Sequence, residues 1–223
     1  MQKKMRFFLC KVIAITILAV PHAVWGQATP KTAEDFYNRA DGYLEQGDFD
    51  RAIADLTQVI NLSPNFRQGV AYEDRGYAYL QKKDYDRAIA DSTKAIELDP
   101  NSLYAYNNRG DAYLQKRDYD RAIADYTQVI RINPDRFSAY GKRAMAYMEK
   151  RDADRAIADY TQAIRINPNA AFVYLERGRA YATKGDLDRA IADWEAVLRI
   201  DPNGADATDA KANIERAKQQ RGR

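Results

Sequence analysis

One line of eighteen residues recurs five times in this chain, and this repetition limits the possible fold more than any other feature of the sequence. Its copies occupy residues 48–65, 84–101, 118–135, 152–169 and 186–203. Their central alanines lie 36, 34, 34 and 34 residues apart, and a proline follows each alanine by twelve residues. A fixed period near 34 residues is typical of a repeat array, in which each unit stacks on its neighbours.

The copy at residues 118–135 is predicted to be a helix with one apolar face. Its apolar residues fall at steps of three and four: Tyr119, Ala122, Ile123, Tyr126, Val129 and Ile130. Asp118 supplies a carboxylate at the first turn, and Pro134 ends the helix. A second helical segment, clearest at residues 106–115, precedes it. Each unit is therefore predicted to be two helices joined by a tight turn.

Further columns recur in register with these helices. A small residue stands in the first helix of every unit, and a tyrosine follows it by three residues: Ala40, Gly76, Gly110, Ala144 and Gly178, then Tyr43, Tyr79, Tyr113, Tyr147 and Tyr181. With the alanine and proline columns, this pattern resembles the tetratricopeptide repeat (TPR) family over about residues 33–204. The resemblance implies an all-α fold, a right-handed α-solenoid of five helix–turn–helix units at 33–66, 69–102, 103–136, 137–170 and 171–204. Residues 205–223 are predicted to form a capping helix with a basic tail.

Three departures from the repeat pattern lead to local predictions. Ser92 and Ala153 stand where other copies carry large apolar residues, so the second and fourth repeats are predicted to be less stable. Two extra residues near Arg67 and Gln68 either lengthen one loop or tilt the first repeat. The third concerns the turn before each second helix, where two copies carry glycine and three carry lysine or arginine: Gly47, Lys83, Arg117, Arg151 and Gly185. A positive φ is expected there if the glycines mark a backbone requirement.

The first 26 residues have the pattern of a secretory signal peptide. Four cations precede or interrupt an apolar run at residues 12–20, no acidic residue is present, and small residues follow. Cleavage is predicted after Gly26 or Ala28, with an uncleaved membrane anchor as the alternative. We therefore expect a periplasmic or secreted protein with no stable membrane span after processing.

Processing would also remove the chain's only cysteine and histidine, Cys10 and His22. The mature chain then lacks thiolate and histidine chemistry and sulfur or imidazole ligands for zinc. It keeps 31 positive and 32 negative residues, so its near-neutral charge argues against a nucleic-acid partner. No catalytic constellation or phosphate-binding loop is present, and we expect no enzymatic activity and no cofactor.

An arginine and an aspartate stand in fixed register in every repeat. The five arginines are predicted to bond the aspartate of their own repeat: Arg39 with Asp55, Arg75 with Asp91, Arg109 with Asp125, Arg143 with Asp159, and Arg177 with Asp193. The alternative is an arginine ladder for phosphate or nucleic acid, which requires unpaired arginines.

In the family that this chain resembles, the first helix of each repeat lines a concave groove. The resemblance therefore implies a peptide-binding groove formed by Tyr77, Tyr104, Asn107, Asp111, Met145, Phe172, Leu175 and Arg179. The carboxylate-binding residues of chaperone-binding members are not matched, because Asp41, Tyr77 and Asp111 stand at those positions. We expect an extended or helical protein segment with apolar anchors as the ligand, bound by a monomer. Two alternatives stay open: some of these residues pack between first helices, or the protein is a self-associating structural element of the envelope.

Overall fold

The computed structural model of the protein describes residues 30–222, so the predicted signal peptide and its cleavage sites lie outside the described residues. Eleven α-helices and one short 3₁₀ helix make up the described part. They are α1 (Ala33–Glu45), α2 (Phe49–Leu62), η1 (Phe66–Gly69), α3 (Val70–Gln81), α4 (Tyr85–Leu98), α5 (Leu103–Gln115), α6 (Tyr119–Ile132), α7 (Phe137–Glu149), α8 (Ala153–Ile166), α9 (Ala171–Thr183), α10 (Leu187–Ile200) and α11 (Ala205–Arg221).

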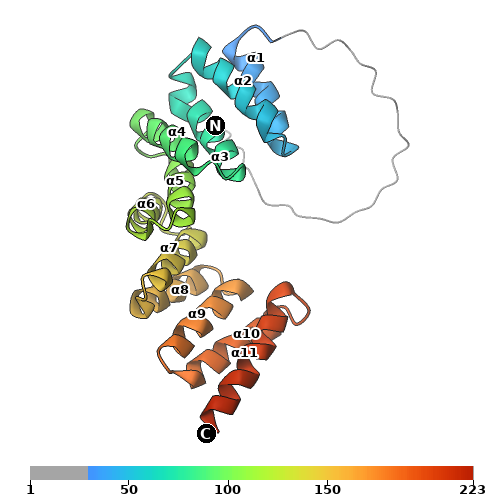
Figure 1. The fold of residues 1–223 in the computed structure, drawn as a ribbon, viewed down its shortest axis with the longest axis vertical. Helices are drawn as coiled ribbons and strands as arrows, with labels where there is room; N and C mark the ends of the chain where they lie inside the picture. Colours follow the sequence, from blue (N-terminus) through green and yellow to red (C-terminus); the bar gives the residue numbers. More distant parts are fainter. Residues whose placement is uncertain (1–29, 223) are drawn as a thin grey trace, which may run out of the picture. The chain divides into compact units, whose positions relative to one another are not determined.

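The helices form pairs that stack in chain order (Figure 1). Each predicted repeat range contains one pair, from α1 and α2 in the first to α9 and α10 in the fifth, and α11 packs on α10 and α9. Ala207, Ala210, Ile214 and Ala217 form the buried side of α11. The predicted α-solenoid is confirmed.

The repeated aspartate at the start of each second helix is its N-cap. Its carboxylate accepts a hydrogen bond from the backbone N–H three residues later in every repeat, at Asp48, Asp84, Asp118, Asp152 and Asp186. The repeated proline follows the C-cap, since it cannot continue the helical hydrogen bonds. The recurrence of both signals explains why the five second helices have the same length.

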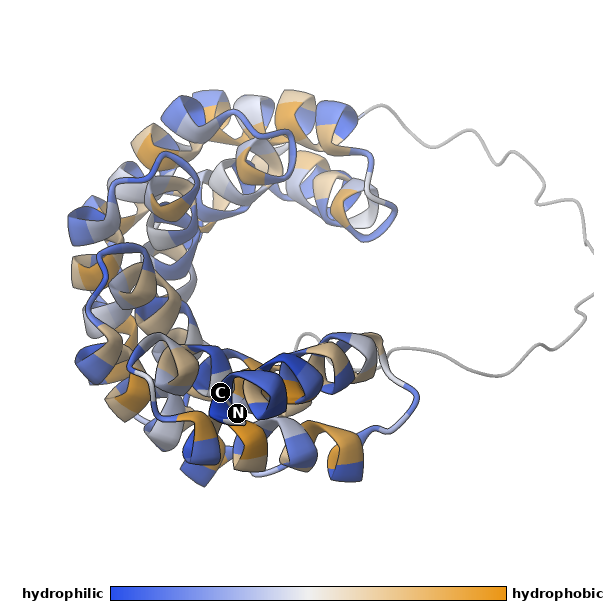
Figure 2. Ribbon diagram, turned by 60° about the horizontal axis from the view of Figure 1, so that its bottom comes forward, coloured by the Kyte–Doolittle hydropathy of each residue, from blue (hydrophilic) through white to orange (hydrophobic). Residues whose placement is uncertain are grey.

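Apolar and polar stretches alternate along the helices (Figure 2). The apolar stretches meet where the small residue of the first helix faces a large residue of the second: Gly110 faces Tyr126, and Gly178 faces Trp194. In the second repeat Gly76 faces Ser92, whose buried Oγ is without a hydrogen-bond partner. This is the loss of packing that the sequence indicates for this repeat, and its lower stability stays a prediction.

The turn before each second helix has a left-handed residue, as the glycines predict. The φ angle is 73° at Gly47, 61° at Lys83, 60° at Arg117, 61° at Arg151 and 80° at Gly185. A residue with a Cβ is disfavoured in this region, so Lys83, Arg117 and Arg151 adopt the positive φ at some conformational cost.

Arg117→Gly is expected to raise the free energy of unfolding by about 0.5–1 kcal/mol, because glycine adopts positive φ without the Cβ clash. Urea denaturation followed by circular dichroism measures the change. Arg117→Ala is the control, since it removes the same side chain and keeps the strain. The explanation is wrong if the glycine variant is no more stable than the alanine variant.

The two extra residues of the first repeat lie in the loop between α2 and α3. Arg67 and Gln68 have φ angles of 44° and 57°, and Gly69 follows at 95°. Across this loop Arg75 still bonds Thr57, a contact that recurs between the later repeats. The insertion therefore lengthens the loop, and this contact between the first and second repeats is kept.

Two pairs of helices on the first-helix side of the array pack directly on each other. α3 packs directly on α5, and α9 packs directly on α11, whereas no two second helices within residues 30–222 pack to this extent.

Candidate protein-binding face

Large apolar side chains are exposed on four consecutive first helices. The exposed fraction is 38% for Tyr77 on α3, 48% for Tyr104 on α5, 41% for Met145 on α7 and 42% for Phe172 on α9. Leu62, at the end of α2, is the only other large apolar side chain among the described residues that is exposed to this extent. We call the outward side of the first helices the first-helix face.

Leu175 does not belong to this face, and its predicted place in the groove is wrong. It is 3% exposed and packs in a core cluster with Trp194 and with Ile214 of α11. Its carbonyl oxygen also accepts a hydrogen bond of 3.2 Å from Trp194 Nε1. Leu175 occupies in α9 the position that Asn107 occupies in α5, which is why it was predicted to face the groove. In the structure, α11 covers this part of α9.

Asn107 and Asp111 form a polar cluster with a lysine that the sequence analysis did not single out. The Asp111 carboxylate accepts hydrogen bonds from Lys142 Nζ at 2.7 Å, from the Tyr126 hydroxyl at 2.7 Å and from Asn107 Nδ2 at 3.3 Å. Lys142 also donates to Asn107 Oδ1 at 3.2 Å. The cluster joins α5 to α7 and fixes the orientation of both predicted residues.

The next repeat lacks this cluster because Met145 stands where repeat three carries Asp111. Tyr160, the counterpart of Tyr126, is fully buried and its hydroxyl is without a hydrogen-bond partner. The exchange of Asp111 for a methionine therefore exposes an apolar side chain on the face and leaves a polar atom unsatisfied beneath it.

Arg179 lies at the far end of the face and is already bonded. Its guanidinium pairs with Glu176 at 2.5 Å and with Asp209 of α11 at 2.6 Å. Burial raises the pKa of Glu176, and the neighbouring Arg179 opposes that rise. Arg179 therefore holds α11 against α9, and a ligand would have to share it.

Glu73 lies on the α3 part of the face in an unusual environment. Its carboxylate accepts a hydrogen bond from the Ser102 hydroxyl, and its backbone oxygen accepts one from Asn108 Nδ2 at 3.3 Å. Burial raises the pKa of Glu73 to about 7, and Asp74 and Asp99 add to the rise while Ser102 opposes it. The sequence gives no sign of this, because Ser102 lies 29 residues from Glu73 along the chain.

Glu73→Gln is expected to change how stability depends on pH. The folded protein binds the Glu73 proton more tightly than an ordinary glutamate with a pKa of 4.5 does. This contribution is complete below about pH 4.5 and is lost as the pH rises through about 7. The glutamine variant should therefore be more stable than the parent above pH 7, by about 3 kcal/mol.

Denaturation midpoints across the pH range test this expectation. Glu45→Gln, a change of an exposed glutamate at the end of α1, is the matched control. Parallel pH profiles for the parent and Glu73→Gln would contradict the assignment.

All five predicted arginine–aspartate pairs are present. The shortest distances are 2.6 Å for Arg39–Asp55, 2.7 Å for Arg75–Asp91, 2.8 Å for Arg109–Asp125, 2.7 Å for Arg143–Asp159 and 2.7 Å for Arg177–Asp193. Two guanidinium nitrogens contact both carboxylate oxygens in each pair. The arginines are therefore bonded within their repeats, which removes the basis for a phosphate-binding ladder.

Four of these arginines also bond the preceding repeat, a contact that the sequence analysis missed. Their Nη1 groups donate to a threonine of the preceding second helix: Arg75 to Thr57 at 2.9 Å, Arg109 to Thr93 at 3.1 Å, Arg143 to Thr127 at 2.9 Å, and Arg177 to Thr161 at 3.0 Å. The threonine recurs at this position in the sequence, and this recurrence could have predicted the contact. Each of these arginines thus joins two repeats.

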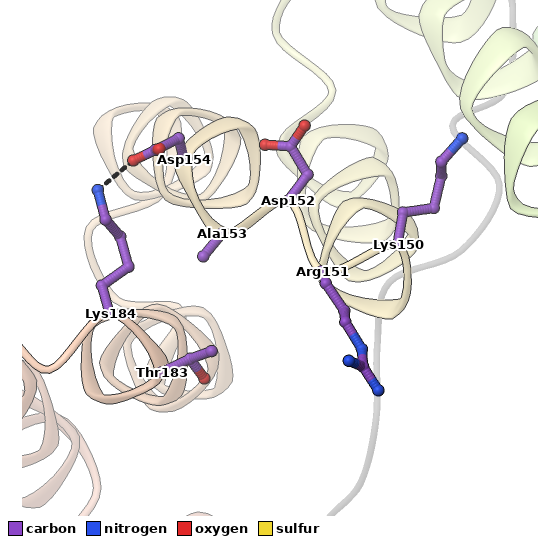
Figure 3. Close-up of a pocket in the computed structure, with 7 residues that line it drawn as sticks. All are labelled: Lys150, Arg151, Asp152, Ala153, Asp154, Thr183 and Lys184. Atoms are coloured by element: carbon purple, nitrogen blue, oxygen red, sulfur yellow. Dashed lines mark hydrogen bonds and ion pairs between the residues drawn. The ribbon is translucent and has the colours of Figure 1, made fainter.

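A second set of contacts joins the repeats at their turns. Figure 3 shows Lys184 paired with Asp154 beside a shallow pocket that Arg151, Asp152 and Thr183 also line. The same pair recurs as Lys82–Asp50, Lys116–Asp86 and Lys150–Asp120, and Arg221–Asp188 closes the row. The pocket is part of this ladder between repeats, and we assign it no ligand.

Within residues 30–222, no cluster of three or more His, Cys, Asp or Glu side chains could hold a metal ion. No helix in that range is long and apolar enough to cross a membrane.

The paired helices and their first-helix face define the class of protein, an α-solenoid that offers an extended surface to other chains. The chain belongs to the tetratricopeptide repeat (TPR) family. Matches described as tetratricopeptide repeat cover residues 33–66, 103–136 and 143–215, and one described as TPR repeat covers residues 76–117. The chain thus has the fold of a protein-interaction scaffold, and such proteins are typically non-enzymatic.

Solved structures have the same fold. A crystal structure of MamA is 27% identical, with a TM-score of 0.70, and the match covers 76% of this chain and 92% of that one. MamA from Desulfovibrio magneticus RS-1 is 21% identical, with a TM-score of 0.73 and coverage of 80% and 99%. YrrB, described as a TPR protein with an unusual peptide-binding site, is 19% identical, with a TM-score of 0.68 and coverage of 81% and 92%. The comparison with curated proteins gave no match.

Proposed function

We propose that this protein is a non-enzymatic scaffold that binds a peptide or a helix of a partner protein on its first-helix face. The observation that carries the proposal is the exposure of Tyr77, Tyr104, Met145 and Phe172 on four consecutive first helices. Exposed aromatic and methionine side chains among polar groups are typical of protein recognition surfaces. YrrB, which has the same fold, was described with a peptide-binding site, so the fold is compatible with this role.

We also propose that the protein works in the periplasm or the cell envelope. The support is the amino-terminal sequence, with its cations, short apolar run and following small residues. Amino-terminal sequencing of the protein recovered from the envelope should begin at Gln27 or Thr29. A sequence that begins at Met1 would show that the segment is retained.

Selection of random displayed peptides on the purified protein tests the binding face. Peptides that bind the parent should lose binding to the double variant Tyr104→Ala/Phe172→Ala, since both changes remove exposed apolar contacts without opening a core. The matched control is Leu62→Ala, because Leu62 is 54% exposed but lies at the end of a second helix.

The helical circular dichroism of both variants should equal that of the parent. Undiminished binding to the double variant, or equal loss in the control, would place the ligand elsewhere. Failure to select any binding peptide would contradict the peptide-binding proposal itself.

The alternative of a self-associating element receives less support. α11 covers the last repeat with a helix whose outward side is polar, which opposes open-ended stacking. A light-scattering mass that stays monomeric over a range of concentrations is the expected result, and a mass that grows with concentration would favour the alternative.

A further inference from the structure

The polar cluster of repeat three has an incomplete counterpart in repeat four. Asp111, Tyr126 and Lys142 correspond, 34 residues further along the chain, to Met145, Tyr160 and Glu176. In repeat three the carboxylate accepts a hydrogen bond of 2.7 Å from the tyrosine hydroxyl and pairs with the lysine. Repeat four has a methionine in place of that carboxylate, and within residues 30–222 the buried Tyr160 hydroxyl has no hydrogen-bond partner. A ligand that supplies an acceptor here would gain a hydrogen bond that the chain itself does not make.

Glu176 brings a carboxylate close to this hydroxyl. The contact of Lys142 with Asp111 joins residues 31 positions apart, and Glu176 follows Met145 by the same number of residues. Burial raises the pKa of the Tyr160 hydroxyl, and the charge of Glu176 adds to the rise, as expected of a nearby carboxylate. A donor and a carboxylate therefore lie close together beneath and beside Met145.

The Glu176 carboxylate is bonded but keeps room for a further donor. It pairs with Arg179 at 2.5 Å, and Arg179 also pairs with Asp209 of α11 at 2.6 Å. The side chain of Glu176 is still 27% exposed. Because an ionised carboxylate offers about four acceptor sites, Glu176 can accept from a ligand while Tyr160 donates to it.

Met145 and Gly141 give a ligand access to these two groups. Met145 is 41% exposed, and its unbranched side chain has three rotatable bonds, so it can turn aside without disturbing the core. One turn earlier on α7, a Cβ added at Gly141 would meet only the Phe172 ring within 4 Å, at 3.9 Å. The missing side chain leaves space beside an exposed aromatic ring, next to the methionine that covers Tyr160.

A primary amide matches the donor and the acceptor together. Its oxygen can accept a hydrogen bond from the Tyr160 hydroxyl while its nitrogen donates one to Glu176. A ligand carboxylate would be repelled by the Glu176 carboxylate, and an apolar group would leave the hydroxyl unsatisfied. The chemistry of the site therefore favours asparagine and glutamine over acidic and apolar side chains.

We infer that the partner segment inserts an asparagine or glutamine side chain beside Met145, where its amide bonds Tyr160 and Glu176, and places an apolar residue against Phe172. This inference rests on the proposed function, because it assigns chemistry to the ligand of the same face. Met145 turns aside on binding and packs against the aliphatic part of the inserted side chain.

The same peptide selection tests the inference. Peptides selected on the parent should share an asparagine or glutamine. Tyr160→Phe should bind a synthetic copy of the tightest peptide about fivefold more weakly. Its free energy of unfolding should not fall, because the change removes an unsatisfied polar group. Replacing the amide residue of the peptide with leucine should weaken binding to the parent by a similar factor, and Tyr160→Phe should then have no further effect.

The matched control is Tyr119→Phe, which removes a tyrosine hydroxyl that bonds Glu149 from the start of a second helix. It should bind the peptide as the parent does. Unchanged affinity of Tyr160→Phe, an equal loss in the control, or peptides that prefer glutamate at the shared position would overturn the inference. The proposed function would still stand if those peptides require Tyr104 and Phe172. A selection without any binder would instead contradict the proposed function, on which the inference rests.

Discussion

Arg109→Met is expected to lower the free energy of unfolding by about 3 kcal/mol. The change removes the guanidinium that contacts both oxygens of Asp125 and the hydroxyl of Thr93. It leaves the Asp125 carboxylate, whose side chain is 5% exposed, without its cation. Burial already raises the pKa of Asp125 against the opposing effect of Arg109, so an unpaired carboxylate there is costly.

Two further variants isolate the buried charge. Arg109→Met/Asp125→Leu should recover most of the loss, because it removes both charges together. Lys116→Met breaks the exposed pair with Asp86 and should change stability by less than about 1 kcal/mol. Urea denaturation measures the free energy of unfolding of each variant. Equal losses for Arg109→Met and Lys116→Met would show that the buried pair contributes no more to stability than the exposed pair.

Gly178→Ala is expected to lower the free energy of unfolding by about 3 kcal/mol. The new Cβ would lie 2.5 Å from Trp194 Nε1 and 2.8 Å from Cδ1, so the indole has to move. That movement also weakens the hydrogen bond from Trp194 to the Leu175 carbonyl oxygen, which is 3.2 Å long. Because Leu175 and Trp194 pack against α11, the loss should extend to the cap.

The first repeat suggests both the control and the rescue. Gly42→Ala places a Cβ with nothing within 4 Å on α1 and should raise stability by about 0.5–1 kcal/mol. Ala40 already packs with Leu56 in that repeat, so Gly178→Ala/Trp194→Leu should lose less than the sum of its single changes. Additive losses in the denaturation cycle would mean that the clash with Trp194 is not the cause.

The sequence was sufficient for the elements whose signals lie within one repeat. Helices, caps, left-handed turns and the arginine–aspartate pairs all depend on residues close in the chain, and five copies of the pattern reinforce one another. Leu175 was misplaced because its burial depends on α11, whose packing no register within the repeat reveals. The contacts of Lys142 likewise arise between repeats.

The recurring contacts that join the repeats use residues that lie apart from the first-helix face, and this affects how such a chain can vary. The lysine–aspartate pairs between the later repeats join residues 30 positions apart, and the arginine–threonine bonds join residues 16 positions apart. A copy of residues 103–136 inserted after itself would meet at both ends the donors and acceptors it needs. Several residues on the first-helix face vary from repeat to repeat, and their contacts between units, such as Lys142 with Asp111 and Arg179 with Asp209, do not recur along the array. A lineage can therefore lengthen the array, or exchange its ligand, while the scaffold keeps its contacts.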